Sequence, residues 1–426
     1  MTNPFAFYGA ITIFILVYAM IIWEKFNRTV IAMTGGLIMI LIGFLSQETA
    51  IKDDIDFNTI GLLIGMMILV SITRRSGIFE AIAIWAAQVT KGYPLPLLAL
   101  LSIITAISSA FLDNVTTVLL MVPVTITLTN RLNINPMPFL ITEILTCNIG
   151  GTATLIGDPP NIMIGSATHL TFMDFIIHLA PIAILILLVT IGLLLLFYHK
   201  ELGVEEENRL QILTLSPKEQ IKDWLLLKQS LSVLALTLLG FFLHGTLHLE
   251  SATIALSGAM LLMLISREEP EEILLHVEWP TVFFFAGLFM LVGGLKSTGV
   301  IKALAEWAIS LTGGQLDLTA YLVIWLSAIA SAFIDNIPFV ATMIPMLHEM
   351  SSISGGNMDP VWWSLALGAC LGGNGTLIGA SANVIVSGIG EKNGHPISFR
   401  HFFTVAFPFM ILSIIMAHLY VYLRYF

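Results

Sequence analysis

The sequence has little charge: only 11% of its 426 residues are Asp, Glu, Lys or Arg, whereas 57% are hydrophobic. A soluble domain carries about 25% charged residues, so this chain has too little polar surface to cover a globule in water. Its mean hydropathy of +0.92 leads to the same conclusion. We therefore predict an all-α polytopic membrane protein whose main partner is the lipid bilayer.

Other residues and motifs that are scarce or missing exclude further classes of protein. The two cysteines, Cys147 and Cys370, are too few for a disulfide framework and read as small buried hydrophobes. Despite the net charge of −10 there is no basic stripe that would bind nucleic acid. The chain has no P-loop and no GxSxG motif, and His348-Glu349 lacks the second histidine of a zinc protease. We expect neither an enzyme nor a bound cofactor beyond a coupling sodium ion or proton.

Apolar runs of about 20 residues predict membrane-spanning helices. The first run starts at Phe5 without a preceding basic region, so it reads as a span and not as a signal peptide. Further spans are expected at 30–45, 57–73, 137–163, 173–198, 225–244, 252–266, 280–296, 361–388 and 402–424. Shorter segments lie at 78–90 and 300–312. The tracts 95–130 and 318–350 are apolar but broken in the middle, and 199–222 reads as a solvated polar linker.

The two halves of the chain repeat each other at a constant offset of 222 residues. Asp113-Asn114 recurs as Asp335-Asn336, and the glycine-rich stretch 150–161 recurs at 372–383. We predict a first repeat at 1–198 (scaffold helices 1–92, hairpin and broken helix 93–165, closing helix 173–198), a cytoplasmic linker at 199–222 and a second repeat at 223–426 (scaffold helices 223–314, hairpin and broken helix 315–390, closing helix 401–426).

The repeats are predicted to be inverted. If the broken tracts are re-entrant hairpins, each repeat crosses the membrane five times, and an odd number of crossings reverses the second copy. With both termini outside, fourteen of the Lys and Arg residues fall on the cytoplasmic side and four outside, as in the cell membrane. Inverted repeats with broken helices are typical of secondary transporters, whose substrates bind where the half-helices end.

The predicted binding site combines the two hairpin tips with the two unwound helices. A carboxylate inside a membrane is functional by default, although Asp113 and Asp335 also suit N-caps. Asp158 has Ala380 at the related position, which makes it the main candidate for carrying a proton or sodium, with Glu143 as a second proton-coupling candidate. Sodium ligands are expected from Asp113, Asn114, Asp335 and Asn336. The remaining candidates are Thr116, Thr117, Gly151, Thr152, Thr154, Asn161, Gly373, Asn374, Thr376, Ser381 and Asn383. No Lys or Arg is expected in this core.

Residues 110–117, 148–161, 334–338 and 371–383 resemble the group that includes the melanosomal P protein, arsenite permeases and NhaD-type sodium/proton antiporters. This group belongs to the ion transporter superfamily, with the sodium-coupled dicarboxylate transporters. The resemblance implies an elevator-type transporter that is usually a homodimer, and it leaves open an arsenite-pump ATPase subunit as a partner.

The expected function is a secondary active transporter, coupled to protons or sodium, that moves a small inorganic ion such as sodium or arsenite by alternating access. Two alternatives remain open. One is a sodium-coupled anion or dicarboxylate importer of the same fold, and the other is a passive ion channel.

Overall fold

The computed structural model describes residues 4–23 and 25–426, and every regular element among them is helical. The first half contains α1 (Pro4–Ile22), α2 (Arg28–Leu41), α3 (Gln47–Thr49), the π-helical turn η1 (Ala50–Asp54), α4 (Phe57–Arg75), α5 (Ile78–Val89), α6 (Pro94–Leu112), α7 (Asn114–Arg131), α8 (Met137–Thr152), α9 (Pro159–Ala167) and α10 (Phe172–Tyr198). A connector with α11 (Glu206–Leu213) and η2 (Pro217–Gln220) follows.

The second half contains α12 (Trp224–Leu247), α13 (Ser251–Ser266), α14 (Pro270–Leu274), α15 (Trp279–Ser297), α16 (Val300–Thr312), α17 (Leu316–Phe333), α18 (Asn336–Ser354), α19 (Asp359–Gly372), η3 (Gly373–Gly375), α20 (Ser381–Lys392) and α21 (Phe399–Tyr425). Most of these helices have a partner in the first half at the offset of 222. For example, α4 and α15 begin and end at related residues, and α7 and α18 both begin at an asparagine.

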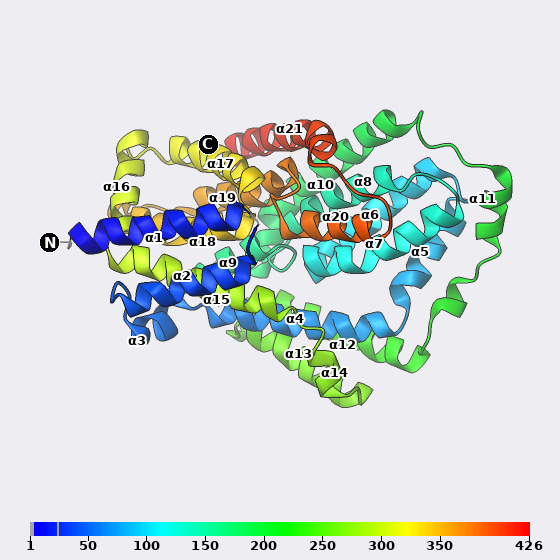
Figure 1. Ribbon diagram of the computed structural model, residues 1–426, viewed down its shortest axis with the longest axis horizontal. Helices are drawn as coiled ribbons and strands as arrows, with labels where there is room; N and C mark the ends of the chain where they lie inside the picture. Colours follow the sequence, from blue (N-terminus) through cyan, green and yellow to red (C-terminus); the bar gives the residue numbers. More distant parts are fainter. Residues whose placement is uncertain (1–3, 24) are drawn as a thin grey trace.

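The packing has the same two-fold relation. Helix α2 packs on α15, and the related pair α13 and α4 packs in the same way. Within each repeat, α6 packs on α8 and α17 packs on α19. Figure 1 shows the hairpin α6–α7 toward the right of the molecule and the hairpin α17–α18 toward the left, so the two repeats are inverted. The predicted fold class is confirmed.

Close backbone approach holds the hairpins on the broken helices. A Cβ on Gly150 of α8 would lie 2.6 Å from the carbonyl carbon and from the Cα of Ala106 on α6. At the related position in the second repeat, a Cβ on Gly372 would lie 2.6 Å from the Cα and carbonyl oxygen of Ala328. Glycine at both positions therefore lets two helix backbones touch, which is a common way to pack helices in membranes.

Eight helices in the described chain are long and apolar enough to cross a membrane: α1, α4, α6, α10, α12, α15, α17 and α21. Helices α2 and α13 have only 14 and 16 residues, fewer than the about 20 residues that a straight membrane crossing needs. Each broken helix is divided as predicted, since α8 ends at Thr152 and α9 begins at Pro159, while α19 and α20 are separated by η3 and residues 376–380.

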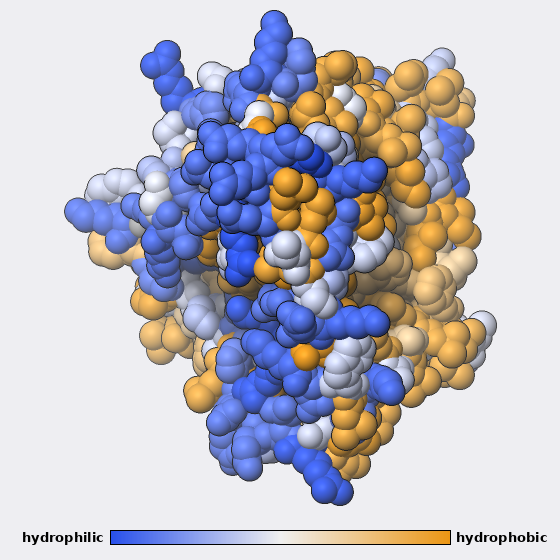
Figure 2. Space-filling model, turned by 90° about the vertical axis from the view of Figure 1, so that its right-hand side faces the viewer, coloured by the Kyte–Doolittle hydropathy of each residue, from blue (hydrophilic) through white to orange (hydrophobic). Residues whose placement is uncertain are grey.

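The connector differs from the predicted solvated linker because part of it packs on the bundle. Ile212 in α11 is buried, and the Gln88 side chain on α5 donates a hydrogen bond to the Leu215 carbonyl at 2.5 Å. The connector lies at the right-hand end of Figure 1, opposite the marked chain ends. Figure 2 looks onto this end and shows a largely hydrophilic surface with hydrophobic residues along one flank.

Candidate functional site

The two hairpins turn at their repeated Asp-Asn pairs, with at most two residues between the helices. A single residue, Asp113, separates α6 from α7, with a φ of +74°. Ile334 and Asp335 separate α17 from α18. The broken helix of the first repeat resumes at Pro159 and Pro160, whose missing N–H groups are not needed in the first turn. These breaks place four helix starts around one buried centre.

Asp158 lies at this centre and joins the two hairpin tips. The Asn114 side-chain amide of the first tip donates to Asp158 Oδ1 at 3.1 Å. The Asn336 amide of the second tip donates to Oδ1 at 3.3 Å and to Oδ2 at 3.5 Å. All three side chains are buried. Both tips therefore end at one carboxylate, and neither hairpin continues to the opposite end of the molecule.

Asn148 on α8 links the first repeat to the second. Its amide nitrogen donates to Asn374 Oδ1 and to Asn383 Oδ1, both at 2.9 Å, and its oxygen lies 3.5 Å from the Asn114 amide. Asn374 in turn donates to the Leu145 carbonyl at 3.2 Å. Asn148 was not among the predicted site residues. The repeat gives no signal for it, because Cys370 stands at the related position.

Two further predicted residues, Asn161 and Asn383, hold the unwound segments in place. The Asn161 amide donates to the carbonyls of Thr152 and Thr154 at 3.2 and 2.9 Å, and more weakly to that of Gly151. The Asn383 amide donates to the carbonyls of Gly373 and Thr376 at 2.7 and 2.9 Å. A buried carbonyl without a donor is costly, so these asparagines satisfy the backbone where the helix is interrupted.

The threonine hydroxyls of these segments also bond to backbone and do not face the centre. Thr152 donates to the Asn148 carbonyl at 2.7 Å, and Thr376 donates to the Ala332 carbonyl at 2.5 Å. Thr154 donates in the same manner to the Ala110 carbonyl of the first hairpin. They were predicted to line the site, but the structure places them in its supporting framework.

The tip aspartates bond to groups other than the amides that hold Asp158. Both oxygens of Asp113 accept from Thr116, one from its backbone N–H at 2.9 Å and one from its hydroxyl. Asp335 Oδ1 accepts from the Ile337 N–H at 3.1 Å. Both acids therefore act as N-caps, Asp113 for α7 and Asp335 for α18. Of the four residues expected to bind sodium, Asn114 and Asn336 both bond to Asp158, whereas the hydrogen bonds of Asp113 and Asp335 go to other partners.

Arg28 at the start of α2 reaches the second tip, which corrects the prediction that no Lys or Arg lies in the core. Its guanidinium is 2.7 Å from Asp335 Oδ2 and 2.9 Å from the Ser381 hydroxyl, and that hydroxyl donates to Asp335 Oδ2 at 2.8 Å. The sequence places Arg28 next to a short polar connection between two apolar runs, which made it look like a loop residue.

Two side-chain oxygens on α7 have no hydrogen-bond partner among the described residues. They are Asn114 Oδ1 and Thr117 Oγ1, both buried and one turn apart on the same face of α7. Small hard cations prefer oxygen ligands such as carboxylates, amide carbonyls and hydroxyls. Asp158 and the neighbouring Asn114 side chain therefore offer oxygens of the kind that a proton or a small cation binds.

Glu143 lies apart from this centre. It is buried on α8, five residues before Asn148, and its Oε1 accepts from the Thr125 hydroxyl of α7 at 2.5 Å. Its other oxygen has no hydrogen-bond partner within the part of the chain that the structure describes. Among the described residues, no hydrogen bond connects Glu143 to Asp158 or to the asparagine network.

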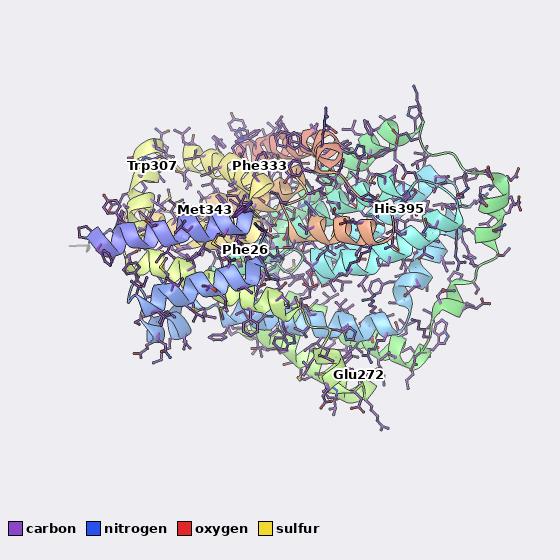
Figure 3. All side chains as sticks on the ribbon, viewed as in Figure 1. Phe26, Glu272, Trp307, Phe333, Met343 and His395 are labelled. Carbon is purple, nitrogen blue, oxygen red and sulfur yellow. The ribbon has the colours of Figure 1, made fainter. Side chains whose placement is uncertain are left out.

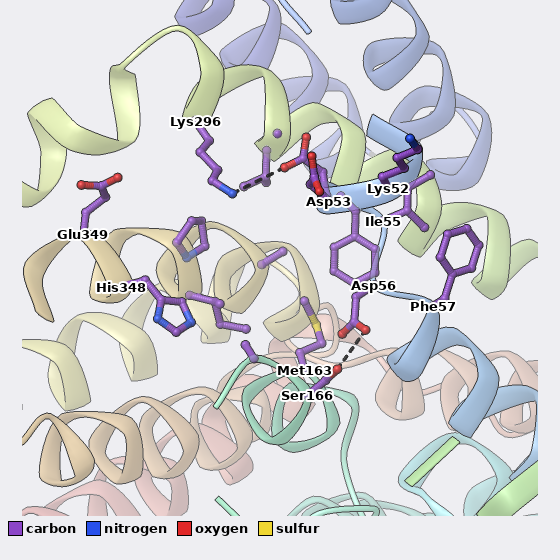
Figure 4. Close-up of a pocket in the computed structure, with 18 of the residues that line it drawn as sticks. Lys52, Asp53, Ile55, Asp56, Phe57, Met163, Ser166, Lys296, His348 and Glu349 are labelled. Carbon is purple, nitrogen blue, oxygen red and sulfur yellow. Dashed lines mark hydrogen bonds and ion pairs between the residues drawn. The ribbon is translucent and has the colours of Figure 1, made fainter. Parts of the chain in front are cut away.

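A cavity of about 660 Å³ approaches the site from the end that carries η1 (Figure 4). Charged residues from the 52–56 segment line one wall, and Lys296, His348 and Glu349 line another. Met163 on α9, two residues after Asn161, is one of its lining residues. Asp158, Asn114 and Asn336 do not line this cavity.

Two related repeats, a helical hairpin in each and a shared buried polar centre are features of a polytopic membrane transporter. The family model described as citrate transporter matches residues 18–368, and the chain belongs to this family. Within the ion transporter superfamily, the predicted resemblance to the P protein is confirmed. The human P protein is 38% identical over 93% of this chain and 57% of its own length.

Bacterial relatives match along the whole chain. An uncharacterized transporter of Mycobacterium tuberculosis is 44% identical and a 46 kDa membrane protein of Mycobacterium leprae is 43% identical, each over 98% of both chains. Two solved structures share the fold at low identity. The YdaH transporter of Alcanivorax borkumensis has a TM-score of 0.59 at 13% identity, covering 88% of this chain and 86% of its own. MtrF of Neisseria gonorrhoeae, described as an antimetabolite efflux pump, has a TM-score of 0.61 at 12% identity, covering 91% and 84%.

Proposed function

We propose that this protein is a secondary active transporter that couples the movement of a small inorganic ion, sodium or arsenite, to protons or sodium at Asp158. The observation that carries the proposal is the position of Asp158, a single buried carboxylate held by an amide from each hairpin tip. A site shared by two hairpins from opposite ends can be opened from either end in turn, as alternating access requires.

The chemistry of the centre favours a cation or a proton as the coupling species. Within the described chain, Asp158 forms no ion pair with a Lys or Arg, and its hydrogen-bond donors are the neutral amides of Asn114 and Asn336. An ionised carboxylate surrounded by apolar helices is costly, and a bound proton or sodium ion removes this cost. The loaded centre would then carry no net charge at Asp158 while it moves through the membrane.

The motion we propose is of the elevator type. The hairpins and broken helices would move as one body against the packed pairs α2–α15 and α4–α13. In support, the network of Asn148, Asn374 and Asn383 joins the central parts of both repeats.

Reconstituted protein in liposomes with a pH-sensitive dye inside tests this proposal. Addition of sodium or arsenite should move protons in the wild type, and Asp158→Asn should abolish this movement because the amide cannot bind a proton or replace the charge. Asp317→Asn is the matched control, since Asp317 lies in the first turn of α17, far along the helix from the tip. Normal coupling in the Asp158→Asn variant would overturn the proposal.

A second candidate is the uptake of a di- or tricarboxylate. The family description, citrate transporter, and the presence of Arg28 at the second tip support it, because arginine binds carboxylates in a bidentate manner. Accumulation of radiolabelled citrate or succinate by the same liposomes, with no proton movement upon addition of sodium or arsenite, would favour this function over the first.

A further inference from the structure

The two hairpin tips are held in different ways. In the first hairpin the turn is self-contained, since Thr116 supplies both its backbone N–H and its hydroxyl to Asp113. Position 338 in the second hairpin is related to position 116 and is a proline, which has neither group to offer. One oxygen of Asp335 is therefore left for partners from outside the hairpin.

This oxygen, Oδ2, accepts from the Ser381 hydroxyl of α20 at 2.8 Å and from Arg28 of α2, while α1 contacts the tip through Tyr18. Arg28 forms an ion pair with Asp335 Oδ2 at 2.7 Å. Tyr18 on α1 donates its hydroxyl to the Pro338 carbonyl at 2.6 Å and lies 3.0 Å from the Thr342 hydroxyl. The related positions in the other repeat are Gly240 and Glu250, which cannot make these contacts. Among the residues that the structure describes, these contacts tie the second tip to helices outside the central unit.

The Arg28 contact bears directly on the centre. Asp335 is followed by Asn336, whose amide binds Asp158, so a residue that fixes Asp335 also fixes the distance from Asn336 to the carboxylate. The Arg28 side chain is 35% exposed, and it lines a cavity of about 260 Å³ together with Asp335. Phe26 and Phe333, labelled in Figure 3, line the same cavity. The ion pair is thus accessible enough to break without unfolding.

We propose that Arg28 is a positioning residue that latches the second hairpin tip over Asp158, and that release of its ion pair opens the centre on this side. The first hairpin has no such latch and stays closed as a self-capped turn. The inference deepens the proposed function, on which it rests for the role of Asp158 as the ion site. The latch itself can be measured without any transport.

The reactivity of the two native cysteines can measure whether the second tip opens. The Cys370 thiol contacts Asn161 Oδ1 at 3.4 Å and is within hydrogen-bonding reach of Asp158, which the second tip covers. The Cys147 thiol donates to the Asn114 carbonyl of the first tip at 3.3 Å. Both are fully buried, so both should react slowly with a small methanethiosulfonate reagent.

Purified full-length protein is treated with the reagent, and each cysteine is followed by peptide mass spectrometry. We expect Arg28→Gln to speed the labelling of Cys370 about tenfold, equivalent to about 1.4 kcal/mol, and to leave Cys147 unchanged. Arg28→Lys should restore most of the protection because it keeps the charge. Arg75→Gln is the matched control: it removes another part-buried arginine ion pair, with Glu268 and Glu272, away from the tips.

Tyr18→Phe provides a milder test if Arg28→Gln does not fold, since it removes one hydroxyl and should raise Cys370 labelling severalfold. Equal rates of Cys370 labelling in the wild type, Tyr18→Phe and any folded Arg28 variant would overturn the latch. The latch would also be overturned if Arg28→Gln accelerated the labelling of Cys147 as much as that of Cys370. The experiments distinguish failure of the proposed function from failure of the Arg28 latch. Normal coupling in Asp158→Asn with faster Cys370 labelling in Arg28→Gln would remove the proposed function and keep the latch.

Discussion

Asn148 is the residue whose replacement should reveal most about the centre. The change Asn148→Asp keeps the shape of the side chain and exchanges an amide donor for a carboxyl oxygen. In the wild type this amide donates to two acceptors at 2.9 Å, Asn374 Oδ1 and Asn383 Oδ1, and both residues are buried. In the variant, an ionised aspartate oxygen would face Asn374 Oδ1 and Asn383 Oδ1. Both hydrogen bonds would be lost, because none of these oxygens carries a hydrogen to donate.

The magnitude follows from the two lost bonds. A buried acceptor left without a donor costs about 1–3 kcal/mol, so two of them should lower the free energy of unfolding by about 2–4 kcal/mol after some relaxation. Asn357→Asp is the matched control. Asn357 is exposed and uses only its Oδ1, which accepts from the Asp359 N–H at 3.0 Å and is retained in aspartate. We expect this control to change stability by less than about 0.5 kcal/mol.

Unfolding in mixed micelles with increasing sodium dodecyl sulfate, followed by tryptophan fluorescence, measures the free energy of unfolding of both variants. Gel filtration before the titration confirms that each variant is folded at the start. A midpoint for Asn148→Asp equal to those of the wild type and of Asn357→Asp would show that the link between the repeats does not depend on this amide, and would refute the reasoning.

Three further predictions concern packing, the first tip and the second buried acid. Gly150→Ala and Gly372→Ala should each destabilise the protein by about 1–3 kcal/mol through overpacking against a hairpin backbone. Gly192→Ala, where the added methyl meets open space, should leave the melting temperature unchanged or raise it, and equal melting of all three variants would contradict the packing. Thr116→Val should cost about 1 kcal/mol by removing a hydrogen bond to Asp113, whereas Thr127→Val on the exposed face of the same helix should cost little in the same titration. Glu143→Gln should keep ion-dependent proton movement in liposomes, because Glu143 lies outside the network around Asp158, and loss of coupling there would assign it a part in the proton path.

The repeat and the breaks could be predicted from the sequence because they depend on local signals. A constant offset fixes the register of both halves, and glycine, proline and Asp-Asn pairs interrupt apolar runs in a way that few other patterns do. The meeting of Asn114, Asn336 and Asp158 follows from that register together with the rule that half-helices end at a shared centre. Whether this centre binds an ion stays a prediction.

The orientation of individual side chains could not be predicted in the same way. A threonine hydroxyl can bond to its own backbone or face a ligand, and Thr152 and Thr376 take the first option. Arg28 looks like a loop charge until α2 is placed beside the second tip, a contact between residues 307 positions apart. Asn148 has no asparagine at the related position, so a comparison of the repeats does not find it.

The hydrogen bonds of Asn148 restrict how this molecule can move. They tie α8 of one repeat to η3 and α20 of the other, so the two halves of the centre have no freedom to slide past each other without breaking buried bonds. Any large displacement must then be accommodated at the edges, where α1, α2 and their relatives meet the hairpins. The centre is therefore expected to move as one rigid body, and the conformational change takes place where the surrounding helices contact it.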